Sequence, residues 1–311
     1  MIPFLQRLDS ARHVLIAGVG GGFDVYAGVP IATYLLERGC SVVFANLSFS
    51  NLWDCGGERV DPNTWRIDAN SKEMPYFPEK WLAEWLVRRS CKAPVYAFAK
   101  TGVEPLRAAY RVLLEQHPVD LVVLVDGGTD SLIFGDEPGL GTVVEDAVSV
   151  IAACNAAPDR TLLAALGFGV DHFHGVSHYS FLENVARLTQ AGGNLGGVSL
   201  VQGTSIADAF LDLVDYANQR QPQHRSIVCN SIASALRGEF GDFQATNRTS
   251  GTELFINPLM TQYWTFAAER VVEHMEFAAA LAKTTTFAEA SLKIEMHREW
   301  VEPRPRKPLP L

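Results

Sequence analysis

The chain has 311 residues, 48% of them hydrophobic and 20% charged, and its formal net charge at pH 7 is −9. This composition is typical of a globular protein with enough apolar side chains for a sizeable core. The negative charge argues against a nucleic-acid backbone or an anionic membrane surface as the main partner.

The cysteines and the apolar runs indicate the compartment. The five cysteines are scattered without a CxxC pair, which favours reduced thiols over disulfides or a zinc site. No run approaches the roughly 18 apolar residues of a membrane span, and the first residues lack the order of a signal peptide. We therefore expect a cytoplasmic protein.

The first strand is predicted at residues 13–17 (HVLIA), and a glycine-rich loop at 18–24 leads from it to a helical pattern at 25–38. In this layout, backbone N–H groups at a helix start face a ligand. The candidate ligand-binding residues of this loop are Gly20, Gly21, Gly22 and Asp24.

The loop departs from the dinucleotide fingerprint. Phe23 occupies the third glycine position, and the next strand, at 42–45, leads to Asn46 and not to an acid that would bind a ribose diol. Asp24 would also meet a pyrophosphate with a negative charge. We therefore disfavour a nicotinamide cofactor and keep another nucleotide or sugar ligand, with Asn46 as a further contact. The structural alternative is a tight turn in which Asp24 caps the helix.

Residues 47–92 interrupt the alternation of strands and helices with a segment rich in tryptophan and proline. Such an insertion in a compact domain is expected to serve as a lid or a binding element. The alternative is that its tryptophans anchor it to the body. Trp81 and Trp85 have helical i, i+4 spacing, which favours core positions.

Regular alternation then resumes, with strands predicted at 95–99, 121–125 and 162–166 and helices at 103–116 and 143–153. Repeated βα units predict a parallel sheet with helices on both faces. We expect one α/β domain over residues 1–300, Rossmann-like and doubly wound. The proline-rich tail, 301–311, is expected to be extended and disordered.

The later segments give weaker patterns. We expect a capping box at Ser180–Glu183, which starts a helix, and a second helix start at Thr286. The remaining expectations are a glycine loop at 192–197, a helix at 206–218, a strand at 226–229, a loop at 241–251, a strand at 253–256 and a helix at 266–282.

Acidic residues gather in the loop at 126–145, directly after a buried strand. Ligands of open α/β sheets bind beyond the carboxyl ends of the strands, where this loop lies. Asp126, Asp130 and Glu145 are the candidate catalytic carboxylates. The candidate ligand contacts of the same loop are Gly127, Gly128, Thr129, Ser131, Gly141 and Thr142.

The chain's one histidine cluster follows the fifth predicted strand. With Asp171 and Asp130 it offers nitrogen and oxygen ligands suited to zinc, iron or manganese, so a divalent metal is the cofactor to consider. The candidate metal ligands are His172, His174 and His178. The alternatives are hydrogen bonds within the loop, or His174 as a single catalytic acid or base.

Thr142–Glu145 forms a GTxxE pattern with Gly141. Its structural interpretation is a capping box at the start of a helix. The pattern also resembles that of nucleoside deoxyribosyltransferases, a resemblance that implies Glu145 as the nucleophile at a sugar carbon. The segment 138–142 is similar to the PGGxGT loop of cytokinin-releasing phosphoribohydrolases, although one glycine is missing and Val144 stands where an acid is expected.

Three longer stretches, GGGFDVYAG, DGGTDSLIFGDEPGLGT and FHGVSH, resemble a prokaryotic family described only as a domain of unknown function. The resemblance implies a Rossmann-like fold and no particular activity. The three stretches contain the three strand-end loops selected above, at 18–24, 126–145 and 171–178. We therefore expect these loops to converge on one pocket.

Cleavage of an N-glycosidic bond builds positive charge on a sugar, which carboxylates stabilise or attack. We therefore expect a hydrolase or transferase acting on a nucleotide, nucleoside or sugar phosphate. The alternatives are a non-catalytic nucleotide-binding or sensing protein and a metal-dependent phosphatase-like hydrolase. A homo-oligomer is compatible with the sequence.

Overall fold

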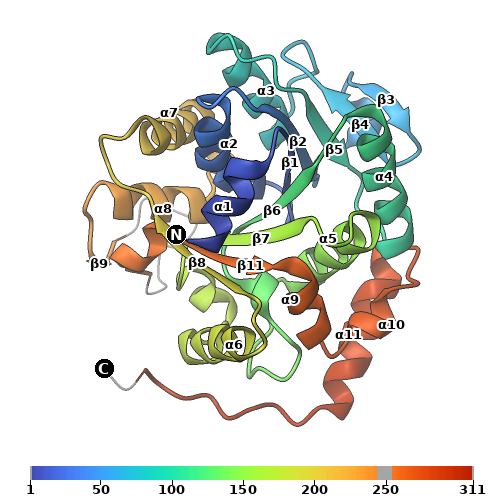
Figure 1. The fold of residues 1–311 in the computed structure, drawn as a ribbon, viewed down its shortest axis with the longest axis vertical. Coiled ribbons are helices and arrows are strands. Elements are labelled where there is room, and N and C mark those ends of the chain that lie inside the picture. The colour runs from blue at the N-terminus through green and yellow to red at the C-terminus, as the bar shows by residue number, and fades with distance from the viewer. Residues whose placement is uncertain (1, 244–253, 310–311) are drawn as a thin grey trace.

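The computed structural model describes residues 2–243 and 254–309, which form a mixed β-sheet between two layers of helices (Figure 1). The α-helices and β-strands, in chain order, are α1 (Pro3–Ser10), β1 (His13–Gly18), α2 (Val29–Leu36), β2 (Ser41–Leu47), β3 (Glu58–Asp61), β4 (Thr64–Ile67), α3 (Pro78–Arg88), β5 (Val95–Phe98), α4 (Val103–Gln116), β6 (Leu121–Gly127), α5 (Val143–Ala156), β7 (Thr161–Leu166), α6 (His178–Gln190), β8 (Asn194–Ser199), α7 (Ser205–Arg220), α8 (Ile227–Leu236), β9 (Gly241–Asp242), β10 (Phe255–Ile256), β11 (Gln262–Ala267), α9 (Ala268–His274), α10 (Ala278–Leu281) and α11 (Phe287–Trp300).

The strands of the large sheet follow the order β3-β4-β5-β2-β1-β6-β7-β11-β8. The five central strands, from β5 to β7 in this order, are parallel, and antiparallel pairs flank them at both edges. These central strands are the five predicted from apolar runs, and the predicted α/β doubly wound class is confirmed. The chain proceeds outward from β1 in one direction and from β6 in the other. The strand order therefore reverses between β1 and β6, where open α/β sheets bind ligands.

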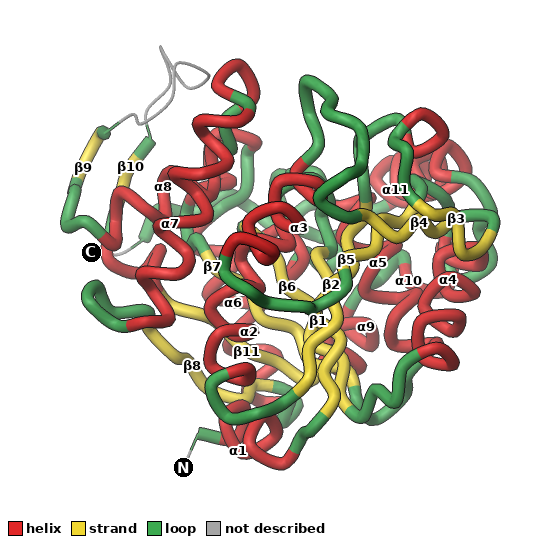
Figure 2. The backbone as a smooth tube through the Cα atoms, turned by 90° about the horizontal axis from the view of Figure 1, so that it is seen from above, coloured by secondary structure: helices red, strands yellow, loops and turns green. Residues whose placement is uncertain are grey.

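Apolar side chains of the sheet alternate between two cores. Val122 and Leu124 of β6 belong to the cluster beneath α4, α5 and α9, whereas Val123 and Val125 belong to the cluster beneath α2, α7 and α8. Figure 2 shows α2 and α7 on one side of the strands and α4, α5 and α9 on the other. Because successive residues of a strand face opposite sides, a continuous apolar run buries both faces of a parallel sheet.

Residues 47–92 belong to the sheet and its helical layer. They supply β3 and β4, with β4 paired to β5, and helix α3. Trp81 and Trp85 are buried, and their indole N–H groups donate to Gln221 Oε1 and to the Asp212 carboxylate, each at 2.8 Å. The core role expected for these two tryptophans is confirmed.

Two expectations for the C-terminal third are wrong because strand pairing overrides the local pattern. The glycine-rich residues 192–197 were expected to form a loop, but Asn194–Ser199 is the edge strand β8. The helix expected at 266–282 begins only at Ala268, because β11 extends to Ala267 and pairs antiparallel with both β7 and β8, and it is divided into α9 and α10. Of the strand expected at 253–256, Phe255–Ile256 forms β10. Of the loop expected at 241–251, Gly241–Asp242 is instead the short strand β9, and residues 244–251 lie outside the described residues.

Serine caps explain two further corrections. Residues 226–229 were expected to form a strand, but Ser226 is the N-cap of α8 and its Oγ accepts from Cys229 N at 3.0 Å. Helix α6 begins at His178 with Ser177 as its N-cap, and not at the box predicted from Ser180. The N-cap predicted at Thr286 is confirmed, because its hydroxyl accepts from Glu289 N. Among the described residues, no helix combines the length and apolar character needed to cross a membrane.

Arg304 ties the C-terminal tail to the loop after β6. Its guanidinium lies 2.8 Å from Asp136 and 3.0 Å from Glu137, and it also pairs with Glu183. The Arg304 backbone N–H donates to Asp136 O at 2.7 Å. The described part of the tail, up to residue 309, has no helix or strand, as its prolines predict, but this anchor runs against the expectation of disorder.

We expect Arg304→Ala to lower the free energy of unfolding by about 2 kcal/mol, because it leaves the nearly buried Glu137 carboxylate without its cation. Urea unfolding at pH 7 measures the change. Arg306→Ala is the matched control, because the Arg306 guanidinium makes an exposed contact of 3.4 Å with the ring of His172 and no ion pair is found for it among the described residues. Equal stability of the two variants would show that the anchor contributes nothing.

Candidate functional site: a carboxylate-lined cavity

A cavity of about 210 Å³ lies at the carboxyl ends of β1, β6 and β7. All three strand-end loops selected from the sequence contribute to its wall. The residues that line it are Gly20, Gly21, Phe23, Asp24, Phe49, Tyr76, Asp126, Gly127, Asp130, Thr142, Glu145, Asp146, Asp171, Phe173, His174, Ser226, Ile227 and Val228. The cavity therefore occupies the point where the strand order reverses.

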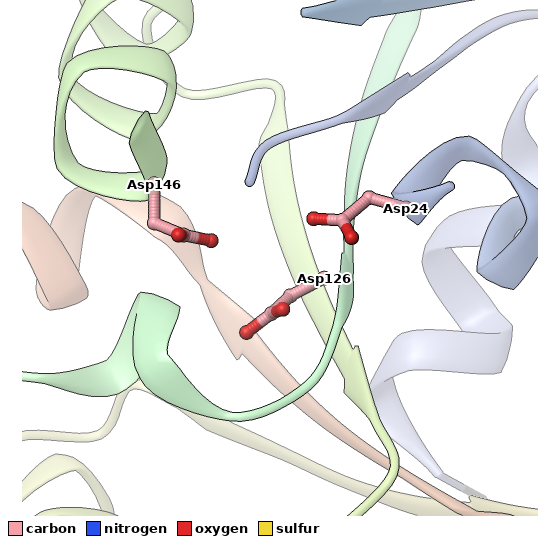
Figure 3. A group of neighbouring side chains, drawn as sticks. All are labelled: Asp24, Asp126 and Asp146. Atoms are coloured by element: carbon pink, nitrogen blue, oxygen red, sulfur yellow. The ribbon is translucent and has the colours of Figure 1, made fainter. Parts of the chain in front are cut away.

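Three aspartates face one another at the centre of this site (Figure 3). Asp24 begins the short 3-10 helix after β1, Asp126 lies in β6, and Asp146 lies in the first turn of α5. One carboxylate oxygen from each lies within 4.8 Å of the others. We call these three residues the aspartate triad.

The glycine loop after β1 holds Asp24 in place. Its carboxylate accepts from Gly20 N at 2.7 Å, so the structural alternative, in which Asp24 caps the following helix, is wrong. A Cβ at Gly20 would lie 2.6 Å from the same carboxylate oxygen. Gly22 has a φ of +60°, and a Cβ there would collide with the Tyr76 hydroxyl. Glycine at these positions thus keeps space beside Asp24 and Tyr76.

Asp126 and Asp130 each accept two hydrogen bonds from their own loop. Asp126 Oδ2 accepts from the backbone N–H of Ser131 at 3.1 Å and from the Ser131 hydroxyl at 2.5 Å. Asp130 Oδ2 accepts from Thr142 N at 2.8 Å and from its hydroxyl at 2.7 Å. These donors hold the carboxylates in fixed positions, as preorganised sites require.

Asp171 reaches the site from the loop after β7, where its Oδ2 accepts from Thr129 N at 2.6 Å. Several predicted ligand contacts therefore serve the carboxylates or the loop backbone. Asn46, which is fully buried, donates to Gly22 O at 2.7 Å and to Glu79 Oε1 at 2.8 Å. The residues predicted as ligand contacts that do not line the cavity are Gly22, Asn46, Gly128, Thr129, Ser131 and Gly141.

The capping box predicted at Thr142–Glu145 is wrong. The Thr142 hydroxyl donates to Asp130 and makes no cap hydrogen bond to α5. Glu145 lines the cavity and pairs with Lys100 at 2.7 Å. The GTxxE pattern therefore does not form the capping box that its spacing predicts. In the folded chain Thr142 binds Asp130, and Glu145 binds Lys100.

Asp146 is the site residue that the sequence reasoning missed. It is fully buried, and among the described residues neither of its carboxylate oxygens has a hydrogen-bond partner. An unpaired buried carboxylate is costly, and native proteins rarely retain one. In the sequence, only the position of Asp146 in the first turn of a predicted helix could have indicated it. This position is weak evidence for a site, because an acid there is usually explained by the helix dipole.

Burial and mutual repulsion disfavour ionisation of this cluster. Burial, aided by the charge of Asp130, raises the pKa of Asp126 to about 8. Burial and the neighbouring carboxylates also raise the pKa values of Asp24, Asp146 and Asp171 well above the ordinary value. No lysine or arginine lines the cavity within the described part of the chain. A positive species in the cavity would therefore be strongly favoured.

The three candidate histidines do not form a ligand set. His174 lines the cavity, but the rings of His172 and His178 stack on each other with centroids 4.8 Å apart. Burial, together with His172, lowers the pKa of His178. Within residues 2–243 and 254–309, the potential metal-ligand group is the aspartate triad, so the histidine hypothesis is replaced by a carboxylate one.

Aromatic side chains form another part of the wall. Tyr76 stacks on Phe49 with ring centroids 6.5 Å apart, and its ring meets Phe23 edge to face at 5.7 Å. Phe173 adds a fourth aromatic surface beside His174. Phe49 and Tyr76 come from the insertion at 47–92, so this segment takes part in forming the cavity.

The fold and the cavity define a doubly wound α/β protein with acidic and aromatic side chains at its switch point. The chain belongs to the family described as "Protein of unknown function (DUF1152)", whose sequence model matches residues 55–302. This finding confirms the expected family of unknown function, although GGGFDVYAG, one of the three stretches that carried the resemblance, precedes the matched range. No curated protein and no solved structure matches the chain.

Stability without added cations should fall as the pH rises from about 4 to about 8. The folded-state pKa of Asp126, about 8, exceeds its ordinary value of 3.8, so the folded state binds more protons across this range. We expect Asp146→Asn to be about 1–3 kcal/mol more stable than the wild type at pH 8, with the gain vanishing near pH 4. Chemical unfolding in EDTA at the two pH values measures this.

Asp215→Asn is the control, because Asp215 is an exposed acid that pairs with Arg237 on the surface. Its stability should stay within about 0.5 kcal/mol of the wild type at both pH values. If Asp146→Asn is no more stable than the wild type at pH 8, the Asp146 carboxylate carries no burial penalty.

Proposed function

We propose that the protein hydrolyses the N-glycosidic bond of a nucleoside-like substrate in this cavity. The observation that carries the proposal is a cavity that combines buried carboxylates with aromatic surfaces and has no lysine or arginine among its described lining residues. Carboxylates suit sugar hydroxyls and a developing positive charge, and aromatic rings suit the flat face of a base.

The size and charge of the cavity favour a small, uncharged substrate. Its volume of about 210 Å³ is below the roughly 300–1,000 Å³ of pockets for drug-sized ligands, which argues against dinucleotides and polymers. Phosphate recognition usually employs arginine or lysine. The carboxylates would repel a phosphate group, so a nucleoside fits better than a nucleotide.

In the reaction, the bond between the base nitrogen and the sugar carbon breaks, and a water oxygen bonds to that carbon. Asp130 takes a proton from the attacking water, because its carboxylate lines the cavity and is held by two donors from Thr142. His174 gives a proton to the departing base from the aromatic side of the cavity. The neighbouring carboxylates stabilise the positive charge on the sugar.

Glu145 is not given the nucleophilic role that the GTxxE resemblance implies. Its carboxylate pairs with Lys100 at 2.7 Å, and this cation draws charge from the oxygen that would attack. Water is therefore the nucleophile in the proposed reaction. Glu145 remains a wall residue that holds Lys100 near the cavity.

Incubation of the protein with a panel of nucleosides and nucleotides tests the proposal by chromatography of the free base. We expect base release from at least one nucleoside, with weaker activity on its 5′-phosphate. Asp130→Asn should lower kcat by about 10²–10⁴-fold, because general-base catalysis contributes that much. Glu145→Gln should stay within about tenfold, since it only loses the pair with Lys100.

Other outcomes separate the alternatives. Release of phosphate without base would favour a phosphatase-like hydrolase. Saturable binding of nucleosides without turnover would favour a sensing protein. A larger loss in Glu145→Gln than in Asp130→Asn would restore the nucleophilic mechanism and overturn the assignment of water.

A further inference from the structure

We propose that the aspartate triad, Asp24, Asp126 and Asp146, binds one hard divalent cation such as Ca²⁺, Mg²⁺ or Mn²⁺. The inference stands on the geometry of the triad and does not require the proposed reaction. It places the metal on carboxylates at the switch point, and not on the histidines that the sequence indicated.

The spacing of the three oxygens fits a shared ligand. One carboxylate oxygen from each aspartate lies within 4.8 Å of the others. Two oxygens bound to one Ca²⁺ at about 2.4 Å are at most about 4.8 Å apart, so the spacing of each pair in the triad is compatible with a shared Ca²⁺. The three residues come from different elements, β6, α5 and the 3-10 helix after β1, which limits the freedom of the group to spread.

Asp146 supplies an independent observation. Both of its oxygens are buried and have no hydrogen-bond partner within residues 2–243 and 254–309, although the other acids at the site accept hydrogen bonds from the chain. Figure 3 shows its carboxylate directed toward that of Asp24. A buried carboxylate without donors is accounted for if its oxygens bind a cation.

Gly20 keeps the space between two members of the triad open. A Cβ at this position would lie 2.6 Å from an Asp24 oxygen and 3.1 Å from each Asp146 oxygen. Any other side chain would therefore push the two carboxylates apart or fill the space between them. This requirement gives the glycine loop a function that does not involve a nucleotide phosphate.

The surrounding charges select the kind of cation. The other titratable groups that line the cavity are Asp130, Asp171, Glu145, His174 and Tyr76, and Lys100 pairs with Glu145. An all-oxygen, strongly negative donor set suits Ca²⁺, Mg²⁺ or Mn²⁺, because zinc and copper prefer nitrogen or sulfur ligands. The cation would neutralise charges that otherwise repel one another.

Isothermal titration of the full chain, stripped with EDTA and then freed of chelator, tests the site with Ca²⁺, Mg²⁺ and Mn²⁺ in turn. We expect saturable binding of one ion per chain for at least one of them. The affinity should rise from pH 5 to pH 8, because the carboxyls must lose protons to bind the metal. Asp146→Asn should weaken binding by at least about tenfold, while Asp215→Asn should not change it.

Loss of binding in Asp146→Asn counts only if the variant stays folded, which circular dichroism and its unfolding transition establish. Gly20→Ala is a second variant that should weaken binding without removing a ligand. The proposal is overturned if the wild type binds none of the three ions at millimolar concentration, or if Asp146→Asn binds them equally well. Metal binding without base release would reject the proposed reaction alone. Base release by a chain that binds none of the three ions would reject the metal site alone.

Discussion

Repulsion among carboxylates buried at the switch point is the constraint around which this protein is organised. Asp24 follows strand β1, and Asp126 lies at the end of the neighbouring strand β6. The pairing of these two strands therefore brings the two aspartates together. Helix α5 adds Asp146 and the loop after β7 adds Asp171. Acids this close and this buried resist ionisation together, and burial accordingly raises the pKa of Asp126 to about 8.

The surrounding loops partly offset this cost. Backbone N–H and hydroxyl groups of Ser131, Thr142 and Thr129 donate to Asp126, Asp130 and Asp171, so each of these carboxylates keeps at least one satisfied oxygen. Asp146 is the exception. A group of this kind adds nothing to the stability of the fold, and its retention is consistent with a ligand-binding role. The proposed reaction and the proposed cation site are two separate proposals, and both depend on the negative charge of these carboxylates.

Distant parts of the chain support the cavity. The insertion at 47–92 contributes Phe49 and Tyr76 to the wall, while Arg304 of the tail fixes the segment Asp136–Glu137 within the same loop that carries Asp130. The family match covers residues 55–302, so Asp24 and Phe49 precede it, and most of the wall lies within it. The site therefore depends on the packing of nearly the whole chain and not on one motif.

The sequence by itself determined the five central strands, the glycine loop and the acids at the strand ends, because apolar runs bounded by turn residues carry their structure locally. It also determined that three loops would meet, since parallel strands end at one edge. Only the tertiary structure decided that β11 pairs between β7 and β8, that Thr142 donates to Asp130 and does not cap α5, and that Asp146 is buried beside Asp24. These outcomes depend on how helices and strands pack across the sheet, and no local spacing of residues encodes that packing.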